Sequence, residues 1–235
     1  MLTILLFFRS CLFYLGFYSS LLICACLCLT VGPFLSLSGR YRYFLYWNRF
    51  ALFWLKLCCG IHVDIQGREN FPDSALVILS NHQSPWETIF LYYFFSPVAA
   101  ILKKELLQIP FFGWSLALLK PIAIDRKRKL TARQAILQQG KDRLAKNISI
   151  LIFPEGTRVQ PGENKIYQTG GAVLAIEAGA SVLPVAHDAG RYWPARRFLK
   201  YPGTIKVRIG LPISTTGRSP RELTNQVETW IKQNN

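Results

Sequence analysis

Residues 75–87 read ALVILSNHQSPWE, and this stretch sets out how the chain folds. Its first six residues form an almost continuous apolar run, which is typical of a strand buried on both faces. Ser84, Pro85 and Glu87 then match the N-cap, first and third positions of a helix, which is the capping-box pattern. His82 is therefore expected in the turn between strand and helix, at the strand end where open α/β sheets place ligands.

After residue 60 the chain alternates between short apolar runs and amphipathic segments. The runs predicted as strands are Ile61–Gln66, Ala75–Ser80, Val98–Leu102, Pro121–Ile124, Ile148–Phe153, Val182–Ala186 and Thr204–Ile209. The segments predicted as helices are Pro85–Phe95, Thr131–Lys146, Gly170–Ala178 and Ser219–Lys232. This alternation predicts an α/β fold with a mixed sheet flanked by helices, preceded by an N-terminal transmembrane or interfacial helical anchor.

The N-terminal segment carries no charged residue between Ser10 and Gly39. Such a stretch is long enough for a helix to cross a bilayer, so residues 1–39 are expected to form a transmembrane helix. A cleaved signal peptide is the alternative, but the apolar stretch is too long and no small-residue cleavage site follows it. Cationic side chains follow the stretch, which places the rest of the chain on the cytoplasmic side of the inner membrane.

Residues 40–59 are apolar and aromatic but include Arg42, Arg49 and Lys56. Because these cations are spaced seven residues apart, they form one stripe on a helix. We therefore expect an interfacial or re-entrant helix that turns this stripe toward lipid phosphates. A second full span would bury the charges in lipid and is disfavoured. Residues 60–235 are then expected to form the catalytic domain.

The formal net charge is +15 at pH 7, and 51% of the residues are hydrophobic. No nucleic-acid-binding motif accompanies the charge, so membrane lipids with anionic head groups and phosphorylated substrates explain it better. All six cysteines precede Gly60 without metal-ligand spacing, so the sequence predicts neither disulfides nor a metal site. The chain also lacks G-x-S-x-G, P-loop, G-x-G-x-x-G and H-E-x-x-H patterns, so no serine nucleophile and no cofactor is expected.

His82 has the properties of a general base if its imidazole stays neutral. A helix N-terminus resists protonation of the ring, and Glu87, five positions on, can accept the N–H of the other ring nitrogen. The structural alternative is a turn histidine next to an ordinary helix cap. Ser219-Pro220-Arg221-Glu222 has the same S-P-x-E pattern without a preceding histidine, so the capping pattern alone indicates no chemistry.

Two separated motifs resemble the signatures of the glycerolipid acyltransferases, specifically the 1-acylglycerol-3-phosphate acyltransferases. The arrangement of His82 and Glu87 resembles the family's NH-x4-D, and residues 153–158 read FPEGTR, the second signature. Further blocks that resemble the family in order are Lys104-Glu105-Leu106, Ile124-Asp125-Arg126 and Val182-Leu183-Pro184-Val185. The sequence departs from the family at Glu87, where Asp is usual, and at Gln168, near which a lysine is frequent.

The resemblance implies a 1-acylglycerol-3-phosphate O-acyltransferase of phospholipid biosynthesis. Its donor is acyl coenzyme A or acyl carrier protein, its acceptor is lysophosphatidic acid, and its product is phosphatidic acid. His82 then takes the proton of the acceptor hydroxyl with Glu87 as its partner, and backbone N–H groups at Ser84–Trp86 are candidates to bind the oxyanion. The alternatives are glycerol-3-phosphate or another lysophospholipid as acceptor, and a non-catalytic membrane lipid-binding protein.

The acceptor phosphate needs fixed cations, and Arg158 is the first candidate because a guanidinium binds phosphate through two N–H groups. The residues expected to shape the same site are Glu155, Gly156 and Thr157. Arg126 is the second candidate or part of a solvated basic run, and Lys104 is a phosphate ligand or a surface residue. His187 is a rival base, although it matches no catalytic position of the family.

Overall fold

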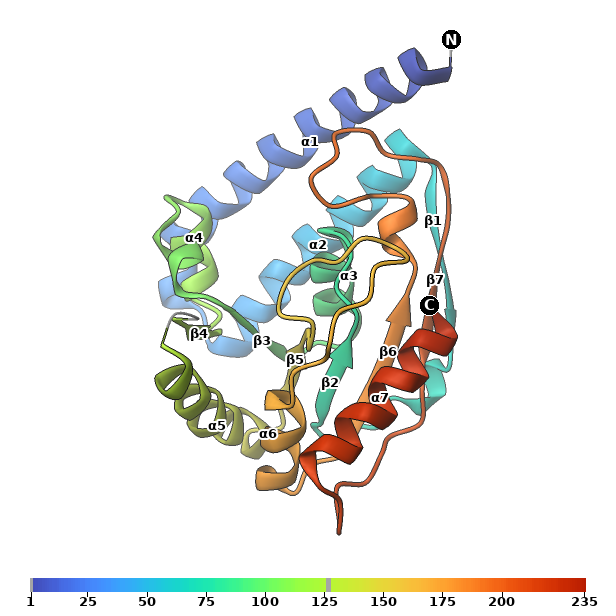
Figure 1. The fold of residues 1–235 in the computed structure, drawn as a ribbon. Coiled ribbons are helices and arrows are strands. Elements are labelled where there is room, and N and C mark those ends of the chain that lie inside the picture. Colours follow the sequence, from blue (N-terminus) through green and yellow to red (C-terminus); the bar gives the residue numbers. More distant parts are fainter. Residues whose placement is uncertain (1, 126–127) are drawn as a thin grey trace.

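The computed structural model describes residues 2–125 and 128–235, which form a sheet with helices on both faces (Figure 1). The helices are α1 (Leu2–Val31), α2 (Leu37–Cys59), α3 (Trp86–Phe94), α4 (Phe112–Ala117), α5 (Lys129–Ala145), α6 (Gly170–Ala178) and α7 (Pro220–Asn234). The strands are β1 (Ile61–Gln66), β2 (Val77–Ser80), β3 (Val98–Lys103), β4 (Ile122–Ile124), β5 (Ser149–Ile152), β6 (Val182–His187) and β7 (Gly203–Ile209). Short 3-10 helices are η1 (Gly32–Phe34), η2 (Arg68–Asn70), η3 (Lys104–Gln108) and η4 (Ala189–Arg191).

The seven strands lie in the order β1-β7-β6-β2-β5-β3-β4. All neighbouring strands pair in parallel except β6 and β7, which are antiparallel. Strand β2 is central, since it pairs with β6 on one side and β5 on the other. The expected α/β fold with a mixed sheet is therefore confirmed, and the turn after β2 lies at the middle of the carboxyl edge.

Two apolar cores cover the two faces of the sheet, and β2 contributes to both. Ile78 packs with side chains of α1, α2 and α3, whereas Val77 and Leu79 pack with α5, α6 and α7. This alternation follows from the pleat, in which successive side chains point to opposite faces. It explains why the strand is apolar from Val77 to Leu79, as expected for a strand covered on both sides.

Helices α1 and α2 form an antiparallel hairpin on one face of the molecule (Figure 1). Tyr43 Oη donates to Cys24 O at 2.9 Å, and Trp54 Nε1 donates to Phe13 O at 3.2 Å. Near the N-terminal end of α1, Arg9 Nε donates to Cys58 O at 2.7 Å, at the last turn of α2. The backbone carbonyls that lack partners at that helix end thus receive a charged donor.

Helix α1 also packs along the part of the chain after residue 60 rather than standing apart from it (Figure 1). Its first half contacts the segment around Lys200, whose backbone N–H donates to Ser10 Oγ at 3.0 Å. Just beyond its C-terminal end, Arg40 donates to Gly32 O at 2.8 Å and to Leu118 O at 3.2 Å. Among the described residues, the stretch 2–34 is the one helical segment long and apolar enough to cross a membrane. Only 17% of the apolar part of this segment is buried inside the protein.

Hydropathy did not reveal η3 and α4, which connect β3 to β4. This segment exposes large apolar side chains, so no polar face marks it as a helix. The exposed residues are Leu106, Ile109, Phe111 and Trp114. Helix α4 has only six residues, which is too short for a helical period to be recognised in the sequence.

Candidate active site

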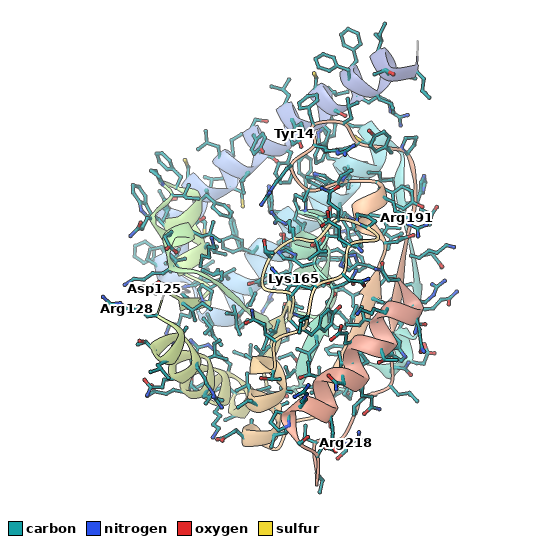
Figure 2. All side chains as sticks on the ribbon, viewed as in Figure 1. Tyr14, Asp125, Arg128, Lys165, Arg191 and Arg218 are labelled. Atoms are coloured by element: carbon teal, nitrogen blue, oxygen red, sulfur yellow. The ribbon has the colours of Figure 1, made fainter. Side chains whose placement is uncertain are left out.

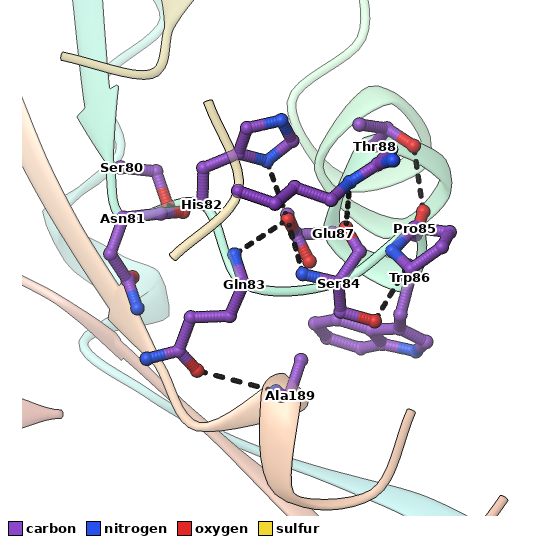
Figure 3. Close-up of polar contacts among 12 residues, drawn as sticks. Ser80, Asn81, His82, Gln83, Ser84, Pro85, Trp86, Glu87, Thr88 and Ala189 are labelled. Atoms are coloured by element: carbon purple, nitrogen blue, oxygen red, sulfur yellow. Dashed lines mark hydrogen bonds and ion pairs between the residues drawn. The ribbon is translucent and has the colours of Figure 1, made fainter. Parts of the chain in front are cut away.

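His82 lies in the turn between β2 and α3, and its imidazole is paired with Glu87 (Figure 3). His82 Nδ1 lies 2.7 Å from Glu87 Oε1, and the exposed fractions of the two side chains are 15% and 0%. Because the carboxylate can only accept, the pairing assigns the ring proton to Nδ1. The other ring nitrogen, Nε2, is then left with a lone pair, as a general base requires.

The same carboxylate oxygen of Glu87 also accepts the backbone N–H groups of Gln83 at 3.0 Å and Ser84 at 2.9 Å (Figure 3). Burial acts to raise the pKa of Glu87, but the hydrogen bonds from His82 and the Ser84 N–H hold that pKa below its usual value. Glu87 is therefore a buried, ionised partner of the imidazole.

Only half of the capping box expected at Ser84 forms. The Glu87 side chain accepts the N–H of Ser84, but helix α3 begins at Trp86 with Pro85 as its N-cap and without a side-chain cap. Ser84 Oγ instead accepts the N–H of Trp86 at 3.1 Å. The matching pattern at Ser219 does form a complete capping box. The same four-residue pattern thus serves as a cap at α7 and as part of the histidine site at α3.

The FPEGTR segment after β5 and the next residue, Val159, hold His82 from the other side through three contacts. The Phe153 ring stacks on the imidazole with centroids 4.1 Å apart and planes at 14°. The His82 N–H donates to Glu155 Oε2 at 2.9 Å, and the N–H of Val159 donates to the His82 carbonyl at 2.8 Å. The two signatures, more than 60 residues apart in the sequence, therefore meet at one residue.

Glu155 is buried, and its second oxygen accepts the hydroxyl of Tyr167 at 3.4 Å. It thus lies beneath the His82 backbone instead of among the exposed side chains of the segment. Burial raises the pKa of Glu155 to about 7, although its hydrogen bonds from His82 and Tyr167 oppose the shift. Its carboxyl group is consequently poised to change charge near neutral pH.

This raised pKa predicts a pH dependence of stability. Because the folded-state pKa exceeds the unfolded value, the folded protein binds the proton more tightly, and stability falls as pH rises from about 4.5 to about 7. We expect Glu155→Gln to flatten this part of the curve. The check is the midpoint of thermal unfolding of both proteins between pH 5 and 8. An unchanged slope in the variant would contradict the assignment.

Arg158 is exposed, and its Nε donates to the Ser84 carbonyl at 3.2 Å, beside the start of α3. This bond leaves the two terminal nitrogens of the guanidinium for a ligand. Thr157 is exposed next to it, and Gly156 has φ +71°, a left-handed conformation that favours glycine. The positive group and the imidazole thus belong to adjoining parts of one site.

The other two predicted phosphate ligands are Lys104 and Arg126, and only Lys104 is among the described residues. Lys104 is exposed at the end of β3, and β3 pairs in parallel with β5, so Lys104 and Phe153 follow neighbouring strands at the same edge. Arg126 lies outside the described residues. Two residues later, Arg128 Nε lies 3.8 Å from Asp125 Oδ2, within ion-pair distance.

The N–H groups expected to bind the oxyanion are already bonded. That of Ser84 donates to Glu87 and that of Trp86 to Ser84 Oγ, while Pro85 between them has none. This part of the prediction is wrong, because the turn uses these donors to hold the carboxylate of Glu87.

His187 lies close to the site but has no ring nitrogen left for a substrate. Its Nε2 lies 3.0 Å from the Asn81 carbonyl, and its Nδ1 accepts the N–H of Ala189 at 3.3 Å. The Asn81 side chain completes the arrangement with bonds of 2.8 and 3.0 Å to the His187 backbone. Burial lowers the pKa of His187, so it is a neutral structural histidine. Sequence reasoning missed this pairing because the two residues are 106 positions apart.

A cavity of about 330 Å³ lies on the backbone side of the site. Its walls include Gln83, Glu155 and Tyr167, together with exposed cations such as Lys165 and Arg191, which are labelled in Figure 2. Gln83 closes one side through bonds of 3.2 Å to Gly190 N and to Asn235 Oδ1. The cavity therefore borders the residues that position His82, and the ring of His82 does not line it.

Residues 62–188 match the model of the acyltransferase family. The 1-acyl-sn-glycerol-3-phosphate acyltransferase of Pseudomonas aeruginosa is 45% identical over 229 residues, which are 96% of this chain and 89% of that protein. An alpha form from Mus musculus is 30% identical over 74% of this chain and 63% of that protein. The crystal structure of the 1-acyl-sn-glycerophosphate acyltransferase of Thermotoga maritima covers 99% of this chain and 95% of that one, with a TM-score of 0.81 and 24% identity, and supports the fold.

Proposed function

The chain belongs to the acyltransferase family, within the 1-acyl-sn-glycerol-3-phosphate acyltransferases, and we propose that it acylates the sn-2 hydroxyl of lysophosphatidic acid to give phosphatidic acid. The observation that carries the proposal is the 2.7 Å pair of His82 and buried Glu87, beside the exposed guanidinium of Arg158. A base next to a phosphate-binding cation fits an acceptor whose hydroxyl lies close to a phosphate.

The reaction follows from this geometry as a direct transfer. His82 Nε2 takes the proton of the acceptor hydroxyl while the oxygen attacks the carbonyl carbon of the acyl thioester. The carbon–sulfur bond then breaks, and the imidazolium returns the proton to the departing thiolate. Glu87 stabilises the positive charge that the ring carries between these two steps. The ester oxygen comes from the acceptor, so no acyl-enzyme is required.

Arg158 is the group best placed to bind the acceptor phosphate. A guanidinium holds a phosphate through two parallel N–H groups, which an ammonium cannot reproduce. We expect Arg158→Lys to raise the KM for lysophosphatidic acid about tenfold or more and to change kcat by only a few-fold. Steady-state kinetics with lysophosphatidic acid and with a phosphate-free monoacylglycerol measure the effect. A KM that rises equally for both acceptors would argue against a phosphate contact.

The acceptor and the donor are tested together with purified protein. Lysophosphatidic acid, glycerol-3-phosphate and a lysophospholipid with a larger head group are each offered with acyl coenzyme A and with acyl carrier protein. We expect phosphatidic acid as the main product. Transfer to another acceptor alone would replace the substrate and keep the chemistry, whereas lipid binding without any transfer would favour the non-catalytic alternative.

The lipid substrate calls for a membrane-bound enzyme, and the hairpin of α1 and α2 supplies the anchor. Arg42, Arg49 and Lys56 are all exposed on α2, where they can meet lipid phosphates. Because α1 packs along the catalytic domain, the hairpin brings that domain against the bilayer surface. We place the anchor in the inner membrane with the catalytic domain in the cytoplasm, following the charges after residue 39.

The orientation of the catalytic domain is open to a direct test with membrane vesicles. A protease added to inverted inner-membrane vesicles should digest a tag placed after Asn235, whereas vesicles of the original orientation should protect it. Digestion in the opposite preparation would reverse the topology, and recovery of intact protein in the soluble fraction would remove the anchor.

A further inference from the structure

Residues 192–201, the α1 loop, lie against the first half of α1 and take no part in the site described above. The loop is closed at its base by the bond from Tyr201 N to Tyr192 O at 2.9 Å. Trp193 is buried, and its ring meets that of Phe13 edge-on, with centroids 5.0 Å apart and planes at 83°. The base of this loop is therefore packed firmly onto the helix.

Lys200 fastens the other end of the α1 loop. Its side chain is 1% exposed, and its Nζ donates to Phe198 O at 2.6 Å and to the hydroxyl of Tyr14. The ammonium also lies 3.8 Å from the centre of the Tyr14 ring. Within residues 2–125 and 128–235, no carboxylate forms an ion pair with it, so aromatic faces and oxygen atoms hold the charge.

The tip of the α1 loop, by contrast, is open to solvent. Arg196, Arg197 and Phe198 are consecutive exposed residues. The Phe198 ring lies 5.4 Å from that of Phe7 and 5.2 Å from that of Tyr14, measured between centroids. Phe7 is itself 49% exposed and Phe198 44%, so the two rings extend the apolar surface of α1 onto the loop. Two cations thus border a continuous aromatic surface.

We propose that the tip of the α1 loop is a second membrane contact, in which Phe198 enters the interface and Arg196 and Arg197 bind anionic lipid head groups. Aromatic rings next to arginines match the boundary between acyl chains and phosphates, where each finds its own partner. The loop follows β6, whereas the hairpin precedes β1, so two segments that are distant in the sequence would contact the membrane side by side. The inference rests on the membrane attachment proposed above.

Site-specific cross-linking tests the contact without touching the site. A benzophenone amino acid is placed at the position of Phe198, at Phe8 as a control on the exposed face of α1, and at Leu211, an apolar residue 71% exposed. Each protein is irradiated on vesicles of phosphatidylglycerol and phosphatidylcholine. We expect lipid adducts at positions 8 and 198 and essentially none at 211.

The three positions separate the possible failures. Adducts at position 8 but not at 198 would overturn the loop contact and leave the anchor intact. No adduct at either position would remove the membrane attachment itself, and the loop contact with it. A protein–protein adduct at 198 in place of a lipid adduct would assign the surface to a second copy of the chain.

Charge is tested with a matched pair of double variants. Arg196→Gln with Arg197→Gln removes the two cations of the tip. Arg218→Gln with Arg221→Gln removes two cations at the opposite end of the molecule, where Figure 2 shows Arg218 far from Tyr14. At limiting lipid and low salt, the first pair should weaken binding to phosphatidylglycerol vesicles about 10- to 30-fold, and the second should leave it near wild type. If both double variants lost the same binding affinity, the effect would come from the net charge of the protein, and a specific contact of the loop tip would be excluded.

Discussion

Replacing His82 by alanine is expected to lower the rate of acyl transfer by about 10³-fold or more, because the variant loses the group that accepts the hydroxyl proton. The fold should survive the change. Glu87 keeps the N–H groups of Gln83 and Ser84 as donors, so its buried charge is not left alone. The measurement is the initial rate of phosphatidic acid formation by purified protein, with circular dichroism and thermal unfolding as checks of the fold.

The chain offers a matched control for this variant. His62 lies on β1, an edge strand, and is exposed. His62→Ala should therefore transfer acyl groups at the wild-type rate. If His82→Ala kept more than about a tenth of the wild-type rate, His82 would not be the base.

The second large effect is expected at Glu87. In Glu87→Gln the amide oxygen can still accept the three N–H groups that Glu87 Oε1 accepts, so these donors keep their acceptor while the charge is lost. The imidazolium that forms during transfer then has no ionised partner. We expect kcat to fall by about 10³-fold, comparable to the loss in a Ser-His-Asp triad whose carboxylate is replaced by an amide. Steady-state kinetics at saturating donor and acceptor measure this loss.

Two further variants show whether this effect is specific to the pair. Glu222 occupies the same position in the S-P-x-E pattern of α7 and is exposed, so Glu222→Gln removes only a charge at a helix N-terminus and should leave the rate unchanged. Glu87→Asp keeps the charge on a shorter side chain and should restore part of the activity lost in Glu87→Gln. An equally inactive aspartate variant with an intact fold would point to geometry rather than charge.

Much of the fold was predictable because apolar residues recur along the sequence with the period of the strand or helix that buries them. Strand β1 and helix α6 have the bounds that the sequence suggested, and β2 and β5 are shorter than expected by only a few residues. Helix α4 was not predicted because the apolar side chains in and around it, such as Phe111 and Trp114, are exposed. In a single sequence, an apolar residue that is buried in a core cannot be distinguished from one that is exposed on an apolar surface.

The site was predictable to the level of motifs but not of contacts. The pairing of His82 with Glu87 followed from their spacing, because His82 lies in the turn that leads directly into α3, where Glu87 is the second residue. The contacts of Phe153 and Glu155 with His82 depend on β2 and β5 lying side by side, a long-range fact that local patterns do not contain. The binding of Asn81 by His187 has the same origin, across β2 and β6. The catalytic and substrate-binding roles stay predictions.

The central claim is that His82 and Glu87 work as one unit on the acceptor hydroxyl, and a double-mutant cycle tests it most directly. The rates of phosphatidic acid formation are compared for wild type, His82→Ala, Glu87→Gln and the double variant. Residues that act only through each other are strongly non-additive, so the double variant should be about as slow as His82→Ala alone. Losses that multiply in the double variant would contradict the account, because Glu87 would then act on the reaction independently of His82.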